Sequence, residues 1–112
     1  MRTPACVSTI ALCLAVLAPS AARAADAATL WQNKCSKCHG ENGRGDTKMG
    51  HKLYINDLTD PTIQSKFTDQ EATNSIKVGL KDAKGKTIMK AVEGLSDEEI
   101  KSLVAYVRSL KK

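Results

Sequence analysis

The stretch KCSKCHGENGRG, residues 34–45, decides the fold, because it places Cys35, Cys38 and His39 within five positions. The rest of the chain contains only one other histidine. Residues three and four apart are neighbours on a helix surface, so one helical turn would hold both thiols on one side with the imidazole beside them. These residue types at this spacing predict a single compact site.

The first 24 residues have the pattern of a signal peptide. Met1 and Arg2 precede an apolar run, ACVSTIALCLAVLA, and the small residues after it include an Ala-Arg-Ala cleavage site at 22–24. The run breaks at Pro19 and is too short for a transmembrane helix, which needs about 20 such residues. We therefore predict that residues 1–24 are a cleaved signal peptide and that residues 25–112 form an exported, periplasmic domain. An uncleaved membrane anchor is the alternative, but we expect no stable membrane insertion.

Cleavage would leave a small and weakly basic chain. Cys6 and Cys13 would leave with the signal peptide, so the motif would hold the only cysteines of the mature protein. Two arginines would also leave, and 17 basic residues would become 15 against 12 acidic ones, a net charge of about +3. A chain this short forms one domain. Because it has few aromatic residues to fill a core, we expect an additional group, such as a covalently held cofactor, to stabilise the fold. Nucleic acid is not an expected partner of an exported protein.

The pattern after the signal peptide is helical and shows no strand. Asp26 can cap a first helix that runs to about Lys34, which would place both motif cysteines on its last turn. Residues 40–57 contain four of the seven glycines and no apolar period, which indicates a long loop. Asp60 and Pro61 then predict the start of a short helix, because proline is tolerated at the first helical position.

Two capping boxes predict the remaining helices. Thr-Asp-Gln-Glu at 68–71 begins a helix that Gly79 ends. The segment after Gly79 is polar and is expected to be a loop. Ser-Asp-Glu-Glu at 96–99 begins the C-terminal helix, whose apolar residues recur at core spacing: Ile100, Leu103, Val104, Val107 and Leu110. The predicted class is all-α with long loops.

The C-x-x-C-H spacing is the attachment signature for haem. In such a site two thiols add to the vinyl groups of the macrocycle, and the adjacent histidine, His39, ligates the iron. A thiol–disulfide oxidoreductase also uses C-x-x-C, but in a βαβ context that is not visible here. A zinc site from Cys35, Cys38 and His51 has finger-like spacing, yet the fourth position offers only Asp57. We therefore expect one covalent haem c, with Cys35 and Cys38 as its thioether residues.

The signal peptide, the CSKCHG motif, the glycine-rich loop and the closing helix LSDEEIKSLVAYVRSL together resemble a class I cytochrome c of the small, soluble, single-haem bacterial type. The resemblance covers residues 27–112. It implies the class I cytochrome c fold, in which the N- and C-terminal helices pack together around one covalently bound haem. Trp31 matches the usual aromatic packing residue of the first helix, and Tyr106 matches one on the closing helix.

The second axial ligand of the iron has three candidates, Met49, His51 and Met89. The resemblance implies Met89, because the family takes this ligand from the loop before the C-terminal helix, and a soft thioether suits a low-spin iron. The alternatives are a bis-histidine haem through His51 and an open iron with Met89 as hydrophobic filler. Many family members have a proline whose carbonyl accepts a hydrogen bond from the axial histidine. The segment KMGHKLYINDL contains no proline, and we expect a carbonyl near Gly50 to replace it.

Axial positions filled by His39 and Met89 would exclude a substrate from the iron, so the resemblance implies a monomeric electron carrier and not an enzyme. The alternatives are a haem enzyme or a gas- or peroxide-binding protein with a labile sixth ligand, and a cytochrome subunit of a larger dehydrogenase. A positive rim near the haem edge would attract acidic redox partner proteins such as an oxidase, a reductase or a dehydrogenase. This lysine rim consists of Lys34, Lys37, Lys48, Lys52, Lys77, Lys81, Lys84, Lys86 and Lys90.

Overall fold

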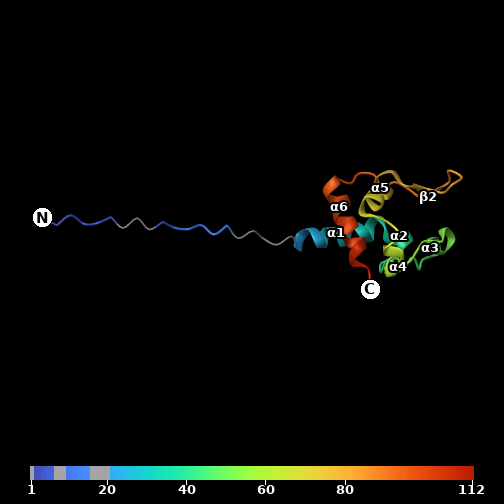
Figure 1. Ribbon diagram of the computed structural model, residues 1–112, viewed down its shortest axis with the longest axis horizontal. Helices are drawn as coiled ribbons and strands as arrows, with labels where there is room; N and C mark the ends of the chain where they lie inside the picture. The colour runs from blue at the N-terminus through green and yellow to red at the C-terminus, as the bar shows by residue number, and fades with distance from the viewer. Residues whose placement is uncertain (1, 7–9, 16–20) are drawn as a thin grey trace.

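The structure is a computed structural model that describes residues 2–6, 10–15 and 21–112. The N- and C-terminal helices of the domain, α1 and α6, pack against each other, and α5 packs on α6 (Figure 1). This arrangement confirms the expected helical fold and the expected contact between the terminal helices. The elements in chain order are α1 (Ala21–Lys34), α2 (Ser36–His39), α3 (Lys48–Leu53), α4 (Pro61–Gln64), α5 (Asp69–Val78), β1 (Leu80–Lys81), β2 (Thr87–Met89) and α6 (Asp97–Ser109).

The hydrophobic core lies where α1, α5 and α6 meet. Trp31, which is 2% exposed, and Leu103, which is 1% exposed, are its largest fully buried side chains. The apolar residues of α6 recur at intervals of three and four, so they form one face of the helix and point into the core together. Leu110 is only partly buried, at the edge of the core. The buried cluster consists of Trp31, Ile76, Ile100, Leu103, Val104 and Val107.

Capping chemistry sets the ends of α5 and α6 as the sequence predicts. The Thr68 hydroxyl accepts a hydrogen bond from the Glu71 N–H, and the Glu71 carboxylate accepts one from the Thr68 N–H. Ser96 and Glu99 make the same reciprocal pair at the start of α6. Gly79 ends α5 with a φ of 79°, a conformation that glycine adopts without steric cost. Both predicted capping boxes and the predicted stop are therefore confirmed.

The long connection before α5 is tied to α6 by side-chain hydrogen bonds. The short helix α4 begins at Pro61, as predicted, and ends at Gln64. Gln64 Nε2 donates to the carbonyls of Leu58, at 2.7 Å, and Val107, at 2.8 Å. Arg108 donates from Nη1 to the Gln64 carbonyl and to its side-chain oxygen, at 2.6 and 2.8 Å. These bonds fix the chain that follows the C-x-x-C-H motif against the C-terminal helix.

The first helix ends at Lys34 as predicted, but its start and the placement of the motif cysteines differ from the prediction. It begins at Ala21, so Asp26 lies inside the helix and is not its N-cap. The alanine-rich sequence around Asp26 has a high helix propensity, which lets the helix extend upstream of the expected cap. α1 ends at Lys34, and Cys35 separates it from α2. The motif therefore forms a short turn of its own rather than the last turn of the first helix.

The predicted signal peptide, residues 1–24, lies partly outside the described residues, and its cleavage stays a prediction. The helix α1 runs across the expected cleavage position after residue 24. In the ranges that the structure describes, no helix has both the length and the apolar character needed to cross a membrane.

A short helix and a hairpin form in segments that the sequence predicts to be loops. The helix α3 lies in the glycine-rich segment, where the Thr47 hydroxyl caps it by accepting a 2.8 Å hydrogen bond from the Gly50 N–H. β1 and β2 form an antiparallel hairpin in the polar segment after α5, so the expectation of no strand is wrong. The Asp82 carboxylate shapes the hairpin turn by accepting hydrogen bonds from the Lys84 and Lys86 N–H groups. The helix and the strands of the hairpin are too short for their apolar residues to show a periodic spacing in the sequence.

Candidate haem site

His39 is the last residue of α2 and lies against the first helix. Its imidazole packs on the indole of Trp31, with ring centroids 5.6 Å apart and an interplanar angle of 45°. Trp31 Nε1 donates a 3.0 Å hydrogen bond to the carbonyl of Gly40, the residue after the histidine. Tyr106 of α6 packs on the same indole, with ring centroids 5.4 Å apart. Trp31 and Tyr106 therefore connect the His39 turn to the contact between α1 and α6.

The surroundings of His39 keep its imidazole neutral. Burial lowers its pKa, because a charged ring would lose its hydration. A neutral imidazole has a lone pair that can bind a metal. His39 Nδ1 is buried and has no hydrogen-bond partner in the described part of the chain. The expected hydrogen bond from this ring to a carbonyl near Gly50 is therefore not found among the described residues.

The two motif cysteines are held in one tight turn with the histidine. The N–H groups of Cys38 and His39 donate to the Cys35 carbonyl, at 3.2 and 3.0 Å. Both cysteines are free thiols, and Cys35 packs against the hydrophobic core. Burial, and then the nearby Cys38, raise the pKa of the Cys35 thiol to about 11. A thiol–disulfide oxidoreductase needs a lowered cysteine pKa, so the raised pKa of Cys35 disfavours that class of enzyme.

The loop after the motif is anchored to the carbonyl groups of the motif itself. The Gly45 N–H donates to the His39 carbonyl at 2.7 Å, and the Thr47 hydroxyl donates to the Cys38 carbonyl at 2.7 Å. A Cβ on Gly50 would overlap the Gly45 carbonyl oxygen, so this approach requires glycine. The sequence reasoning missed Thr47, although a threonine at the start of a short helix is a typical N-cap.

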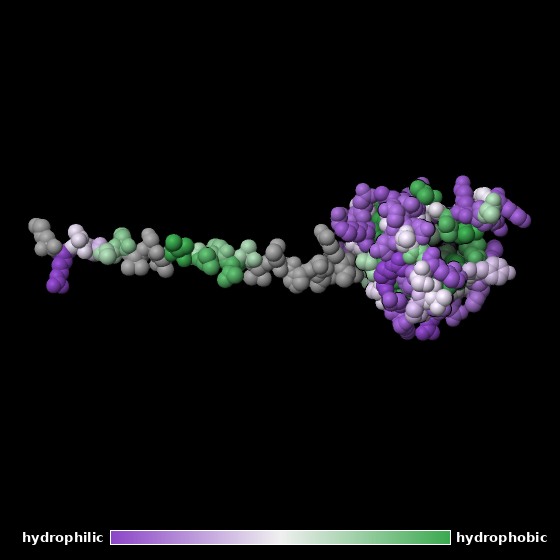
Figure 2. Space-filling model, viewed as in Figure 1, coloured by the Kyte–Doolittle hydropathy of each residue, from purple (hydrophilic) through white to green (hydrophobic). Residues whose placement is uncertain are grey.

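Met89 lies in β2, opposite Leu80 of β1. Its side chain is half-buried and packs against the core cluster that contains Trp31. Nearby in the chain, Val78 is 75% exposed and Leu80 is 46% exposed. Figure 2 shows hydrophobic side chains gathered on this face, between the hairpin and α3. Because exposed apolar surface of this kind commonly marks a binding site, the surroundings of Met89 fit a large apolar cofactor.

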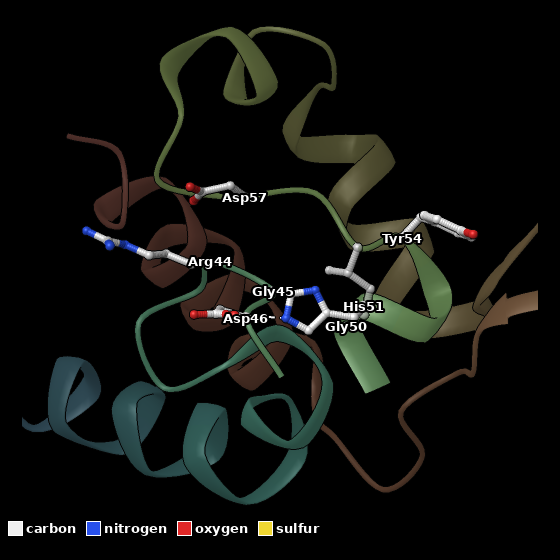
Figure 3. A pocket seen from close by; sticks show the side chains of 8 residues that line it. Arg44, Gly45, Asp46, Gly50, His51, Tyr54 and Asp57 are labelled. Carbon is white, nitrogen blue, oxygen red and sulfur yellow. Dashed lines mark hydrogen bonds and ion pairs between the residues drawn. The ribbon is translucent and has the colours of Figure 1, made fainter. Parts of the chain in front are cut away.

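The other two candidate ligands have different surroundings. Met49 is half-buried in α3. His51 is exposed, and its Nε2 lies 2.9 Å from an oxygen of Asp46. Figure 3 shows this pair in a pocket that Arg44 and Tyr54 also line. The described ranges contain no group of three or more histidine, cysteine or acidic residues that could hold a metal ion, which disfavours the zinc alternative.

A helical domain whose terminal helices pack together, with a C-x-x-C-H turn beside their contact, has the arrangement of a c-type cytochrome. The chain belongs to the cytochrome c family, since the family model described as "Cytochrome c" matches residues 24–111. A solved structure named "KustC0563 c-type cytochrome" is 31% identical, with a TM-score of 0.66, and the match covers 78% of this chain and 99% of that chain. No curated protein matches the sequence significantly. The class I cytochrome c resemblance and its fold are confirmed.

Cytochromes c carry covalently bound haem and act in electron transfer, and the residues of this chain fit such a cofactor. The thiols of Cys35 and Cys38 are free, as attachment to the vinyl groups requires. The neutral ring of His39 follows directly in the same turn. On the hairpin side, Met89 and the exposed Leu80 offer a thioether and an apolar wall.

Proposed function

We propose that this protein carries single electrons between redox partners in the periplasm, through one haem attached to Cys35 and Cys38. In this proposal His39 and Met89 are the axial ligands of the iron. The observation that carries the proposal is the position of Met89. The strand β2 holds this half-buried thioether against the core that contains Trp31, the ring on which His39 packs. An imidazole and a thioether from distant parts of the chain therefore border one core.

Each site residue has a chemical role in this proposal. The thiols of Cys35 and Cys38 form thioether bonds, which make the macrocycle a covalent part of the core. Bound haem supplies one-electron chemistry at its iron. His39 donates its lone pair, and the thioether of Met89 favours the reduced iron and thus a higher potential. With both axial positions taken by the chain, a substrate has no place on the iron, which supports a carrier rather than an enzyme.

Intact mass spectrometry of the exported protein tests the attachment and the processing. We expect the mass of residues 25–112 plus one haem, and we expect the haem to survive acid–acetone extraction because thioether bonds are covalent. In the double variant with Cys35→Ser and Cys38→Ser, any haem should extract into the solvent. A wild-type mass without haem, or wild-type haem that extracts, would overturn the attachment. A haem-loaded chain that keeps residues 1–24 would overturn only the cleavage.

The proposed partners are acidic redox proteins that dock on the lysine rim of a monomeric carrier. Lys81, Lys84 and Lys86 are exposed on the hairpin that carries Met89. Lys77 is partly neutralised, because its Nζ lies 2.8 Å from a carboxylate oxygen of Asp97. Three lysines of the rim are therefore clustered on the hairpin, where their charge would help to orient an encounter despite a small net charge.

Charge reversal on the hairpin tests this docking surface. In the double variant Lys84→Glu and Lys86→Glu, we expect a lower association rate with the natural oxidase or reductase and a weaker dependence of that rate on salt. The reason is that salt screens charges beyond a Debye length of about 8 Å at 0.15 M, so a rate controlled by these lysines falls as salt is added. The measurement is stopped-flow electron transfer over a range of ionic strength, with the reduction potential expected to stay nearly constant.

The matched control reverses Lys101 and Lys111, which are exposed on and after α6, outside the lysine rim. This control variant should change the rate much less than the hairpin variant does. A wild-type rate that is constant from low to high salt would mean that docking is apolar and that the lysines only keep the protein dissolved.

A further inference from the structure

The turn that leaves α5 touches the backbone on which Met89 lies. Gly79 caps α5 with φ 79° and ψ −177°, and its N–H donates a 3.0 Å hydrogen bond to the Ser75 carbonyl. This conformation is nearly restricted to glycine, because a side chain at positive φ meets the neighbouring backbone. The chain then passes directly into β1.

The space beside Gly79 is filled by backbone atoms of the segment 89–91. A Cβ at Gly79 would lie 2.6 Å from the Met89 carbonyl oxygen, 2.9 Å from the Ala91 nitrogen and 3.3 Å from the Lys90 carbonyl carbon. Real Cβ atoms essentially never come within 3.0 Å of another atom. A backbone also cannot rotate away as a flexible side chain can. Any side chain at this position would therefore displace the segment that contains Met89.

Hydrogen bonds hold the same segment on both sides of this contact. Before it, Met89 pairs with Leu80 in the hairpin. After it, the Val92 N–H donates a 2.8 Å hydrogen bond to the Ile76 carbonyl in α5. The segment that contains Met89 is thus held by β1 on one side and by α5 on the other, and the close approach at Gly79 lies between these contacts.

We propose that Gly79 is a positioning residue for Met89, and that its missing side chain allows β2 to lie close enough to α5 for the thioether to reach the iron. This inference rests on the proposed role of Met89 as an axial ligand. Gly79 acts only through the backbone of residues 89–91 and touches no reacting atom. The close contact at Gly79 would fix the strand that carries Met89 to α5. The helix α5 is itself anchored in the core through Ile76.

The chain offers two control glycines that share the positive φ of Gly79 without its contact. Gly85 and Gly94 have φ values of 81° and 79°, and a Cβ at either position would meet nothing within 4 Å. An alanine at each of these three sites has to adopt a positive φ, which side chains rarely do. Only Gly79→Ala adds the collision with the Met89 segment. Because all three variants share the cost of a positive φ, a larger effect in Gly79→Ala than in the two controls is expected from the collision.

The test compares the three variants as haem-loaded proteins. In Gly79→Ala we expect the near-infrared sulfur-to-iron band of the oxidised protein to be lost or strongly reduced, and carbon monoxide to bind the reduced iron about tenfold more readily or better. Gly85→Ala and Gly94→Ala should keep the wild-type band and the wild-type response to carbon monoxide. A Gly79→Ala protein that matches Gly94→Ala in both measurements would overturn the inference.

A second measurement needs no variant and covers the case in which Gly79→Ala fails to fold. Alkaline pH is used to displace the methionine from the wild-type iron, while hydrogen exchange of the Val92 amide is followed. We expect this amide to lose protection together with the near-infrared band, because the ligand can leave only if its segment lifts from α5. An amide that stays protected after the band is lost would overturn the inference. A wild-type protein that never shows the band would instead overturn the proposed ligand itself.

Discussion

The variant Met89→Ala is expected to lose the near-infrared sulfur-to-iron band completely and to bind carbon monoxide when reduced. Alanine offers no atom that can ligate iron, so the sixth position becomes open or is filled by water. Because the thioether favours the reduced iron, the reduction potential should also fall, on the order of 0.1 V or more. Redox titration with optical spectra, before and after addition of carbon monoxide, measures all of these effects on one sample.

The alternative ligands supply the controls for this prediction. Met49→Ala removes the other half-buried methionine, and His51→Ala removes an exposed histidine that already has Asp46 as its partner. Both variants should keep the band and should not bind carbon monoxide. Loss of the low-spin spectrum in His51→Ala, with no change in Met89→Ala, would assign the distal position to histidine.

The variant Trp31→Ala is expected to cause the largest loss of stability of any single substitution in the domain. Trp31 is 2% exposed, belongs to the buried cluster, and is the ring on which both His39 and Tyr106 pack. Truncating a buried tryptophan in this way lowers the free energy of unfolding by about 3 to 5 kcal/mol, a large part of the total for a small domain. Guanidinium unfolding of the haem-loaded protein, followed by circular dichroism, measures this loss.

The variant Trp31→Phe separates packing from hydrogen bonding at the same position. Phenylalanine keeps an aromatic ring but lacks the N–H that donates to the Gly40 carbonyl at 3.0 Å. Leaving that buried carbonyl without its donor should lower the free energy of unfolding by about 1 to 3 kcal/mol, less than the alanine variant does. A loss below about 1 kcal/mol in Trp31→Ala would contradict the central packing role of this residue.

The parts of the fold that the sequence predicts well depend on interactions between near neighbours. Each capping box, at Thr68 and at Ser96, and the helix end at Gly79 involve residues within a few positions of one another. Such local interactions can be recognised from the amino-acid sequence alone. The face of α6 is equally readable, because its apolar residues follow the helical period. The C-x-x-C-H turn belongs to the same group, since Cys35, Cys38 and the histidine share one local set of hydrogen bonds.

The features that the sequence does not predict depend on contacts between distant segments or on very short elements. The hairpin needs Asp82 to shape its turn and Gly79 to admit β2 beside α5, and neither contact leaves a periodic signal. The helix α3 depends on Thr47, which caps it and also binds the Cys38 carbonyl nine residues away. The expected acceptor for His39 near Gly50 belongs to the same group, because it depends on a contact across the loop, and Nδ1 has no partner among the described residues.

In the proposed carrier the chain itself would fill both axial positions of one haem iron, through His39 and Met89. The most direct test is the optical spectrum of the purified, reduced wild-type protein, recorded before and after saturation with carbon monoxide at neutral pH. We predict that the two spectra are the same, because a methionine held by β2 leaves carbon monoxide no vacant position. A prompt and complete shift of the haem bands on adding carbon monoxide would contradict this account, and would instead indicate a gas-binding protein or an enzyme with a labile sixth ligand.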